Sequence, residues 1–348
     1  MNMRWFITLP AQLSTMLLSM AIIVFFFNKS LERFNPLGKG SFVMKVTPEV
    51  VKKWGHEPTH VKTGFLLHEF IRFDVTKNDF LINAILWFEF DPSKISLETL
   101  GKFSFTKGDI LKQSDAVVKK LSDNLSFAQY YLRIQFSSVL DYTLFPINDH
   151  KVFLNLTNNM VDAESIIFDV APKDYVVPKY VFLSGWKLES HEAKAGYTEY
   201  KLSEDQTVSQ QPKVLFSINI KKTDARQLMI ILFPLFMLFY FFIFSLFIKD
   251  YGLNMQLIFT NLLAFMAYTI VVQGMSPVVG YFMLIDYLML FFLAAFFVLG
   301  VVAYVGDENT GYSPEKVDNI RAWTVLFVYI ALIVVMYYLT NVYMVNAA

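Results

Sequence analysis

The chain of 348 residues has room for two domains. Its hydrophobic share of 55%, with only 17% charged residues, is higher than a protein with a soluble surface requires. Thirty basic and thirty acidic side chains cancel, so no overall field attracts nucleic acid, and no nucleic-acid partner is expected. The absence of cysteine excludes disulfides, thiolate nucleophiles and cysteine-bound zinc. We therefore expect a membrane protein surrounded by lipids, with no cofactor and no metal.

The first membrane segment is predicted at residues 1–29, where an apolar run from Trp5 to Phe27 follows Arg4. A helix needs about 20 apolar residues to cross a bilayer core of about 30 Å. The run resembles a secretory signal, but it is long for one and has no A-x-A cleavage site. An uncleaved signal-anchor helix is therefore favoured over a cleaved signal.

Residues 30–224 are predicted to form an immunoglobulin-like β-sandwich, because apolar and polar side chains alternate in several short stretches. The alternation is clear at 132–136 and 214–220, and the stretch 80–90 is apolar at nearly every position, as in a strand buried between two sheets. Helical patterning is confined to short pieces such as PEVVKKWG and SDAVVKKLSDNL. A signal-like start and the length of the domain place it outside the cytoplasm.

Residues 225–348 are predicted to form a four-helix membrane domain. The run 251–285 is too long for one crossing, and Gly274, Pro277 and Gly280 divide it into two helices near Pro277. The first predicted helix is 228–248, and the last runs from 322 to about 343. The second and third lie on either side of Pro277, and the third ends at about Val305.

Several motifs follow one another in a distinctive order. The segment SVLDYTLFPINDHKV contains an aromatic, a proline and a hydrophobe at 145–147, and INIKKTDARQL is a basic junction into the first of the four helices. After the second of these helices come a proline, a tyrosine and an aspartate at 277, 281 and 286. In this order the motifs resemble the pentameric ligand-gated ion channel family, the Cys-loop receptor superfamily, and the loops without cysteine resemble its bacterial branch.

Five residues of the predicted helix 254–273 share one face, because they are spaced by four and three positions. They are Gln256, Thr260, Leu263, Ala267 and Ile270. The resemblance implies that this face lines an ion pore, with polar rings at the inner end and an apolar gate above them. From periodicity alone, Gln256 and Thr260 could equally join helices by hydrogen bonds, which is what we expect of Asn254 and Asn261.

The resemblance also implies a homo-oligomer, a pentamer, and assigns roles to further residues. The acid that cation-conducting relatives place just before the pore helix is absent, with Gly252 near that place. Asp250 is the nearest acid and Lys249 beside it opposes its charge, but cations are favoured. Tyr197 and Tyr200 lie in a segment like the family's ligand-capping loop, where aromatic faces could hold an unidentified small molecule or ion. Coupling of the sandwich to the pore is expected at Phe145, Pro146, Asn148, Asp149, Lys222, Pro277 and Tyr281.

Two alternatives to a channel are weighed. A non-conducting membrane receptor or scaffold could retain the same fold, and the additional N-terminal helix favours it slightly. His56, Glu57 and His60 match the zinc-protease pattern H-E-x-x-H, but Pro58 lies inside the helical turn that the pattern requires. An enzyme is therefore not expected.

Overall fold

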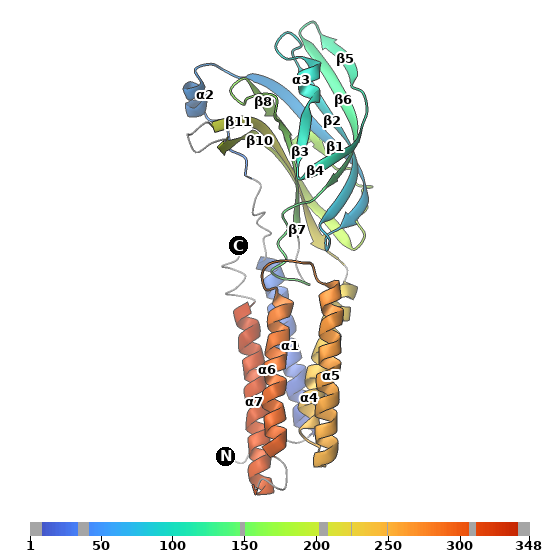
Figure 1. Ribbon diagram of the computed structural model, residues 1–348, viewed down its shortest axis with the longest axis vertical. Helices are drawn as coiled ribbons and strands as arrows, with labels where there is room; N and C mark the ends of the chain where they lie inside the picture. The colour runs from blue at the N-terminus through green and yellow to red at the C-terminus, as the bar shows by residue number, and fades with distance from the viewer. Residues whose placement is uncertain are drawn as a thin grey trace. The chain divides into compact units, whose positions relative to one another are not determined.

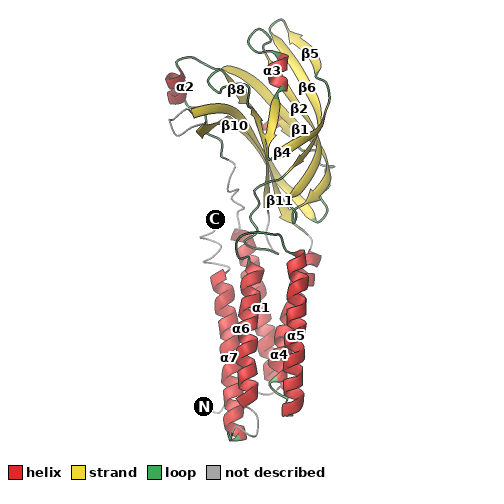
Figure 2. Cartoon of the chain, in the orientation of Figure 1, coloured by secondary structure: helices red, strands yellow, loops and turns green. Residues whose placement is uncertain are grey.

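The computed structural model describes residues 9–33, 42–146, 150–201, 208–223, 225–248, 250–305 and 311–339 (Figure 1). The chain forms two compact units. Figure 2 distinguishes the strands, which build one unit, from the long helices, which build the other. The β unit comprises residues 36–141 and 149–223, and the helical unit comprises residues 1–35, 142–148 and 224–348.

Eleven strands join in one continuous sheet within the described residues of the β unit. Its strand order is β10-β11-β7-β3-β4-β6-β2-β1-β8, while β5 pairs with β6 and β9 pairs with β1. The strands are β1 (Thr59–Asp74), β2 (Asp79–Phe90), β3 (Phe103–Thr106), β4 (Gly108–Gln113), β5 (Val117–Ser122), β6 (Leu125–Phe136), β7 (His150–Asn158), β8 (Ile166–Asp169), β9 (Tyr175–Val176), β10 (Trp186–Lys201) and β11 (Val208–Lys222). Two short helices, α2 (Pro48–Trp54) and α3 (Leu97–Gly101), and a 3-10 turn, η2 (Pro172–Asp174), complete the unit.

The sheet folds over itself into two layers, which confirms the predicted sandwich. Phe65 of β1 stacks on Phe216 of β11 with ring centroids 4.8 Å apart, although many strands separate β1 from β11 along the sheet. The predicted core faces of β6 and β11 are buried between the layers. Strand β2 differs from the expectation, because its burial alternates and only one of its faces is fully buried.

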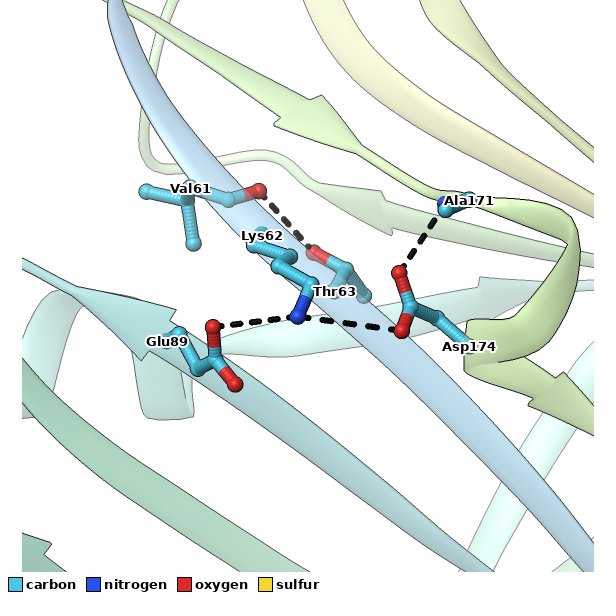
Figure 3. Close-up of polar contacts among 6 residues, drawn as sticks. All are labelled: Val61, Lys62, Thr63, Glu89, Ala171 and Asp174. Carbon is cyan, nitrogen blue, oxygen red and sulfur yellow. Dashed lines mark hydrogen bonds and ion pairs between the residues drawn. The ribbon is translucent and has the colours of Figure 1, made fainter.

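A polar cluster joins three elements of the sandwich (Figure 3). Lys62 of β1 places its Nζ 3.1 Å from Glu89 of β2 and 3.7 Å from Asp174 of η2. Asp174 also accepts a hydrogen bond from the backbone N–H of Ala171 at 3.1 Å, and Lys62 lies 5.1 Å from the ring centroid of Trp87. Every charge in this cluster has an opposite partner, so we interpret it as structural.

One secondary-structure prediction was wrong. The segment SDAVVKKLSDNL forms β5 and the start of β6, which pair as an antiparallel hairpin. The turn at Asp123 and Asn124 reverses the chain, and both residue types favour turns. The spacing of the apolar residues in this segment suggested a helix. It was misleading because Val117 and Val118 are β-branched residues that fit an exposed strand well. The other helical piece, PEVVKKWG, does form α2.

The helical unit contains α1 (Leu9–Arg33), α4 (Ala225–Ser245), α5 (Tyr251–Met275), α6 (Leu284–Val305) and α7 (Pro314–Tyr338). By length and composition, α4 to α7 can each cross a membrane, which agrees with the four predicted helices. Helix α7 begins at Pro314 rather than at residue 322, because Ser313 is the N-cap and proline suits the first helical turn. Aromatic pairs hold the helices together, for example Phe242 on Phe296 at 4.3 Å.

Candidate ion pathway and its junction

One face of α5 is left uncovered by the rest of the chain. The five predicted pore residues, Gln256, Thr260, Leu263, Ala267 and Ile270, are all exposed, with Leu263 at 71% and Ile270 at 70%. At 100° per residue they span about 80° of the helix circumference. The buried residues of α5, which are Asn254, Ile258, Phe265 and Val272, lie on the opposite side. The predicted face is therefore the one available to an axis outside the subunit.

The orientation of α5 is fixed by its contact with α4. Pro234 lies inside α4 and has no N–H to offer the carbonyl of Ile230, four residues earlier. Tyr268 of α5 supplies the missing donor, since its hydroxyl lies 2.6 Å from that carbonyl and 2.9 Å from that of Ile231. A kink-prone position in one helix is thereby stabilised by the next helix, as membrane helices require.

The polar residues of α5 that were expected to join helices lie on its covered side. Asn254 is 0% exposed within the subunit, and Asn261 is half-buried in a cavity of about 660 Å³ shared with α1 and α4. Gln256 and Thr260 both lie on the uncovered face. There the hydroxyl of Thr260 donates to the backbone carbonyl of Gln256 at 2.8 Å. Polar groups thus occur on both sides of the helix, but among the described residues those of the uncovered face have no hydrogen-bond partner on another helix.

Asp250 is the N-cap of α5. Its carboxylate accepts a hydrogen bond from the backbone N–H of Leu253 at 2.9 Å, and its side chain is exposed. Capping explains why an acid stands here even without a role in conduction. It also holds the negative charge at a fixed point at the end of the helix that carries the uncovered face. Lys249, which was expected to oppose this charge, lies outside the described residues.

The variant Asp250→Asn removes the negative charge but retains the helix cap, because asparagine caps a helix as well as aspartate does. We expect the variant to fold and, if α5 lines a cation-preferring pore, to lose about threefold or more of that preference, since a ring of carboxylates at a pore mouth attracts cations. Reversal potentials under a salt gradient measure this preference. Asp286→Asn is the matched control, since Asp286 likewise accepts from a backbone N–H, that of Met283, at 2.8 Å. Unchanged reversal potentials in Asp250→Asn would remove Asp250 from the ion pathway.

The loop that carries the Phe-Pro motif belongs to the helical unit, although it leaves and re-enters the β unit. The backbone N–H of Tyr142 donates to the Tyr281 hydroxyl at 2.9 Å, and the N–H of Leu284 donates to the carbonyl of Thr143 at 2.9 Å. Phe145 and Pro146 are buried and joined by a cis peptide bond. The structure therefore brings the loop of Phe145 and Pro146 against Tyr281 and the start of α6, while Pro277 is buried in the same unit. Asn148 and Asp149 lie outside the described residues.

Lys222 ends β11 in the β unit, beside two aromatic rings. Its Nζ lies 5.7 Å from the ring centroid of Trp186, and the ring of Trp186 lies 5.5 Å from that of His150. His150 is only 2% exposed. Burial and the positive charge of Lys222 lower the pKa of His150 from 6.5 to about 3. His150 was not among the predicted site residues, although it is a titratable residue directly after the Phe-Pro loop, a position that could have indicated it.

Acidification is expected to destabilise the β unit through His150. The unfolded chain binds a proton near pH 6.5 while the folded state stays neutral down to about pH 3, so stability is lost as pH falls through this window. At pH 4 the loss is about 3 kcal/mol. Thermal unfolding at pH 7 and pH 4 should show a smaller difference for His150→Phe than for the wild type. His56→Gln, at an exposed histidine, should behave like the wild type, and equal pH dependence in all three proteins would contradict the assignment.

The two tyrosines with a predicted ligand role differ in exposure. Tyr197 of β10 is 5% exposed and contacts Trp54 edge-on at 5.6 Å, whereas Tyr200 is 40% exposed. Only Tyr200 therefore presents its ring to solvent in this state.

The protease-like pattern does not form a helix. His60 lies in β1 and pairs with Asp169 of β8 at 2.7 Å, while Gly55 ends α2 before the pattern begins. Within the described residues, no group of three or more histidine, aspartate or glutamate side chains could hold a metal ion.

These features define the class of protein: a membrane protein with a β-sandwich on one side of the membrane and a junction loop packed against its membrane helices. No protein-family model matches the chain. The chain is 25% identical over 243 residues to a proton-gated ion channel of Gloeobacter violaceus, a match that covers 65% of this chain and 66% of that protein, just under two thirds. Together with the fold, this similarity agrees with the resemblance of the sequence to the pentameric ligand-gated ion channel family. A relative that is a channel also agrees with the expectation that the chain is not an enzyme.

Proposed function

We propose that the chain is one subunit of a homopentameric ligand-gated ion channel, which conducts ions, preferentially cations, through a pore lined by α5. Leu263 and its apolar neighbours Ala267 and Ile270 form the hydrophobic gate in this proposal, and Gln256 and Thr260 form the polar inner end. The sandwich lies outside the cytoplasm.

The observation that carries this proposal is the uncovered face of α5. Gln256 and Thr260 are exposed on a helix that is apolar enough to cross a membrane, and polar side chains rarely face lipid. A water-filled axis between subunits resolves this conflict, because it hydrates the polar end of the face. The apolar end would then close the same axis by excluding water rather than by a solid plug.

The stimulus is proposed from the relative. Because the Gloeobacter protein is a proton-gated channel, pH is the first stimulus to apply, followed by small amines and divalent ions. Tyr200 remains the candidate contact for a cationic ligand, because a cation can bind over the face of an aromatic ring. The Phe145 and Pro146 loop would pass the signal to the connection between α5 and α6.

Two measurements on the purified full chain test the proposal. Native mass spectrometry in mild detergent should give a pentamer, and bilayer recordings should give current that depends on the stimulus. A well-formed pentamer that stays silent under all stimuli would favour the non-conducting receptor or scaffold. A stable monomer or dimer, in lipid as well as in detergent, would overturn the pore assignment itself.

A further inference from the structure

A small pocket in the β unit lies where the β10–β11 hairpin meets the turn between β3 and β4. Its volume is about 260 Å³. Of the described residues that line it, the charged ones are both lysines, Lys107 and Lys213, and none is an aspartate or a glutamate. Hydroxyl groups line it as well, among them those of Thr106, Ser137, Thr198 and Tyr200. The pocket therefore gathers positive charge and hydrogen-bond donors.

Lys213 of β11 is the buried lysine of the pocket, since it is only 6% exposed. Its Nζ donates to the carbonyl of Phe42 at 3.2 Å, which is its one hydrogen bond within the described residues. An ammonium group has three N–H donors, so this contact leaves two of them for other partners. Burial lowers the pKa of Lys213, and no carboxylate of the described residues counteracts this effect. A buried positive charge without a counter-charge is unfavourable, and a bound anion relieves that cost.

Lys107 occupies a position in the β3–β4 turn where glycine would be the easier choice. Its φ of 59° lies in the left-handed region, which residues with a side chain rarely adopt. Lys107 is exposed, so it lies at the rim of the pocket rather than at its base. Unfavourable backbone conformations often occur at functional sites, and here the conformation places a second positive charge at the pocket.

We propose that this pocket binds a small oxyanion, such as inorganic sulfate or phosphate, with Lys213 as its main charged contact. Hydroxyl and ammonium groups both donate hydrogen bonds to negatively charged oxygen atoms, and such charge-assisted bonds are strong. A volume of about 260 Å³ is below the range of roughly 300–1,000 Å³ that is typical of pockets for drug-sized ligands, so the anion is small.

The pocket has two consequences for the β10–β11 hairpin. Because its lining comes from the hairpin and from the β3–β4 turn, a bound anion would hold these two parts together. Its lysines repel a cation, so a cationic ligand at Tyr200 would have to bind outside this pocket. The anion site goes beyond the proposed channel function and does not rest on it.

Equilibrium dialysis of the purified full chain against labelled inorganic sulfate tests the site, and we expect saturable binding. Lys213→Met retains a long side chain but removes the charge. It should weaken sulfate binding about tenfold or more, because hydrogen bonds from a charged donor are about twice as strong as neutral ones. Lys119→Gln is the matched control, since Lys119 is an exposed lysine of β5 that does not line the pocket. Its affinity for sulfate should equal that of the wild type.

Thr198→Val gives a second test, because it removes a hydroxyl group, nearly keeps the shape of the side chain and leaves both lysines in place. Sulfate binding should weaken about threefold. The proposal is overturned if the wild type shows no saturable binding, or if a folded Lys213→Met chain binds sulfate as the wild type does. If Lys213→Met does not fold, wild-type affinity in Thr198→Val overturns it instead.

A carboxylate of the chain itself is the alternative occupant of the pocket. The loop between β10 and β11 contains Glu204 and Asp205, which lie outside the described residues. The double variant Glu204→Gln, Asp205→Asn should bind sulfate as the wild type does. Sulfate binding that occurs only in this double variant would show that the chain fills its own pocket, and the proposal would fail. None of these measurements uses current, so a silent channel would count against the proposed function alone.

Discussion

Leu263→Ser is expected to give a channel that leaks without stimulus. Leu263 lies in the middle of the uncovered face of α5, one turn after Thr260 and one turn before the small residue Ala267. In the proposed pentamer, five serine hydroxyls in place of five leucines would hydrate the proposed gate and remove its dewetting barrier. A reduction of the barrier by only about 1.4 kcal/mol raises the leak tenfold. Resting current in bilayers, or ion flux from vesicles, measures the effect.

Leu262→Ser is the matched control for this variant. Leu262 is about 100° round the helix from Leu263, and it is half-buried in an apolar groove between α5 and α6. The substitution has the same chemistry but should lower stability or assembly rather than open the pore. If the two variants leak equally, or neither leaks, α5 does not line a pore with this face.

The uncovered face of α5 could be predicted from the sequence because helical periodicity and membrane length act locally. Spacings of four and three placed Gln256, Thr260 and Leu263 on one side, and the structure leaves that side uncovered. The break near Pro277 was equally predictable, since a long apolar run interrupted by glycine and proline cannot remain one helix.

The contacts between distant segments could not be read in this way. Ser19 and Tyr240 are separated by 221 positions, and no local pattern indicates that their hydroxyl groups meet. The strand β5 was misread as helix because its pairing with β6, and not its own spacing, decides its conformation. In the same way, the sequence named Tyr281 as a coupling residue, but only the structure identifies its partner atom.

Tyr281→Phe is expected to weaken the transmission of the signal to the pore. The Tyr281 hydroxyl accepts the backbone N–H of Tyr142, which is buried in the junction between the Phe-Pro loop and the α5–α6 connection. Tyr281 is 44% exposed, so the hydrogen bond is only partly buried and its loss costs about 0.5–1.5 kcal/mol. If that cost falls on the docked loop of the proposed channel, activation requires a stimulus up to about tenfold stronger, because about 1.4 kcal/mol is a factor of ten in an equilibrium.

The pair of variants Tyr281→Phe and Tyr312→Phe distinguishes coupling from general damage. Tyr312 is an exposed tyrosine before α7, so its loss of a hydroxyl should leave the activation curve in place. The second loop contact, from the N–H of Leu284 to the carbonyl of Thr143, is retained in both variants, and the pentamer should therefore assemble normally. Stimulus–response curves measure the shift, and native mass spectrometry checks assembly. An unshifted curve for Tyr281→Phe in an intact pentamer would show that the loop is anchored at this hydroxyl but does not transmit the signal through it.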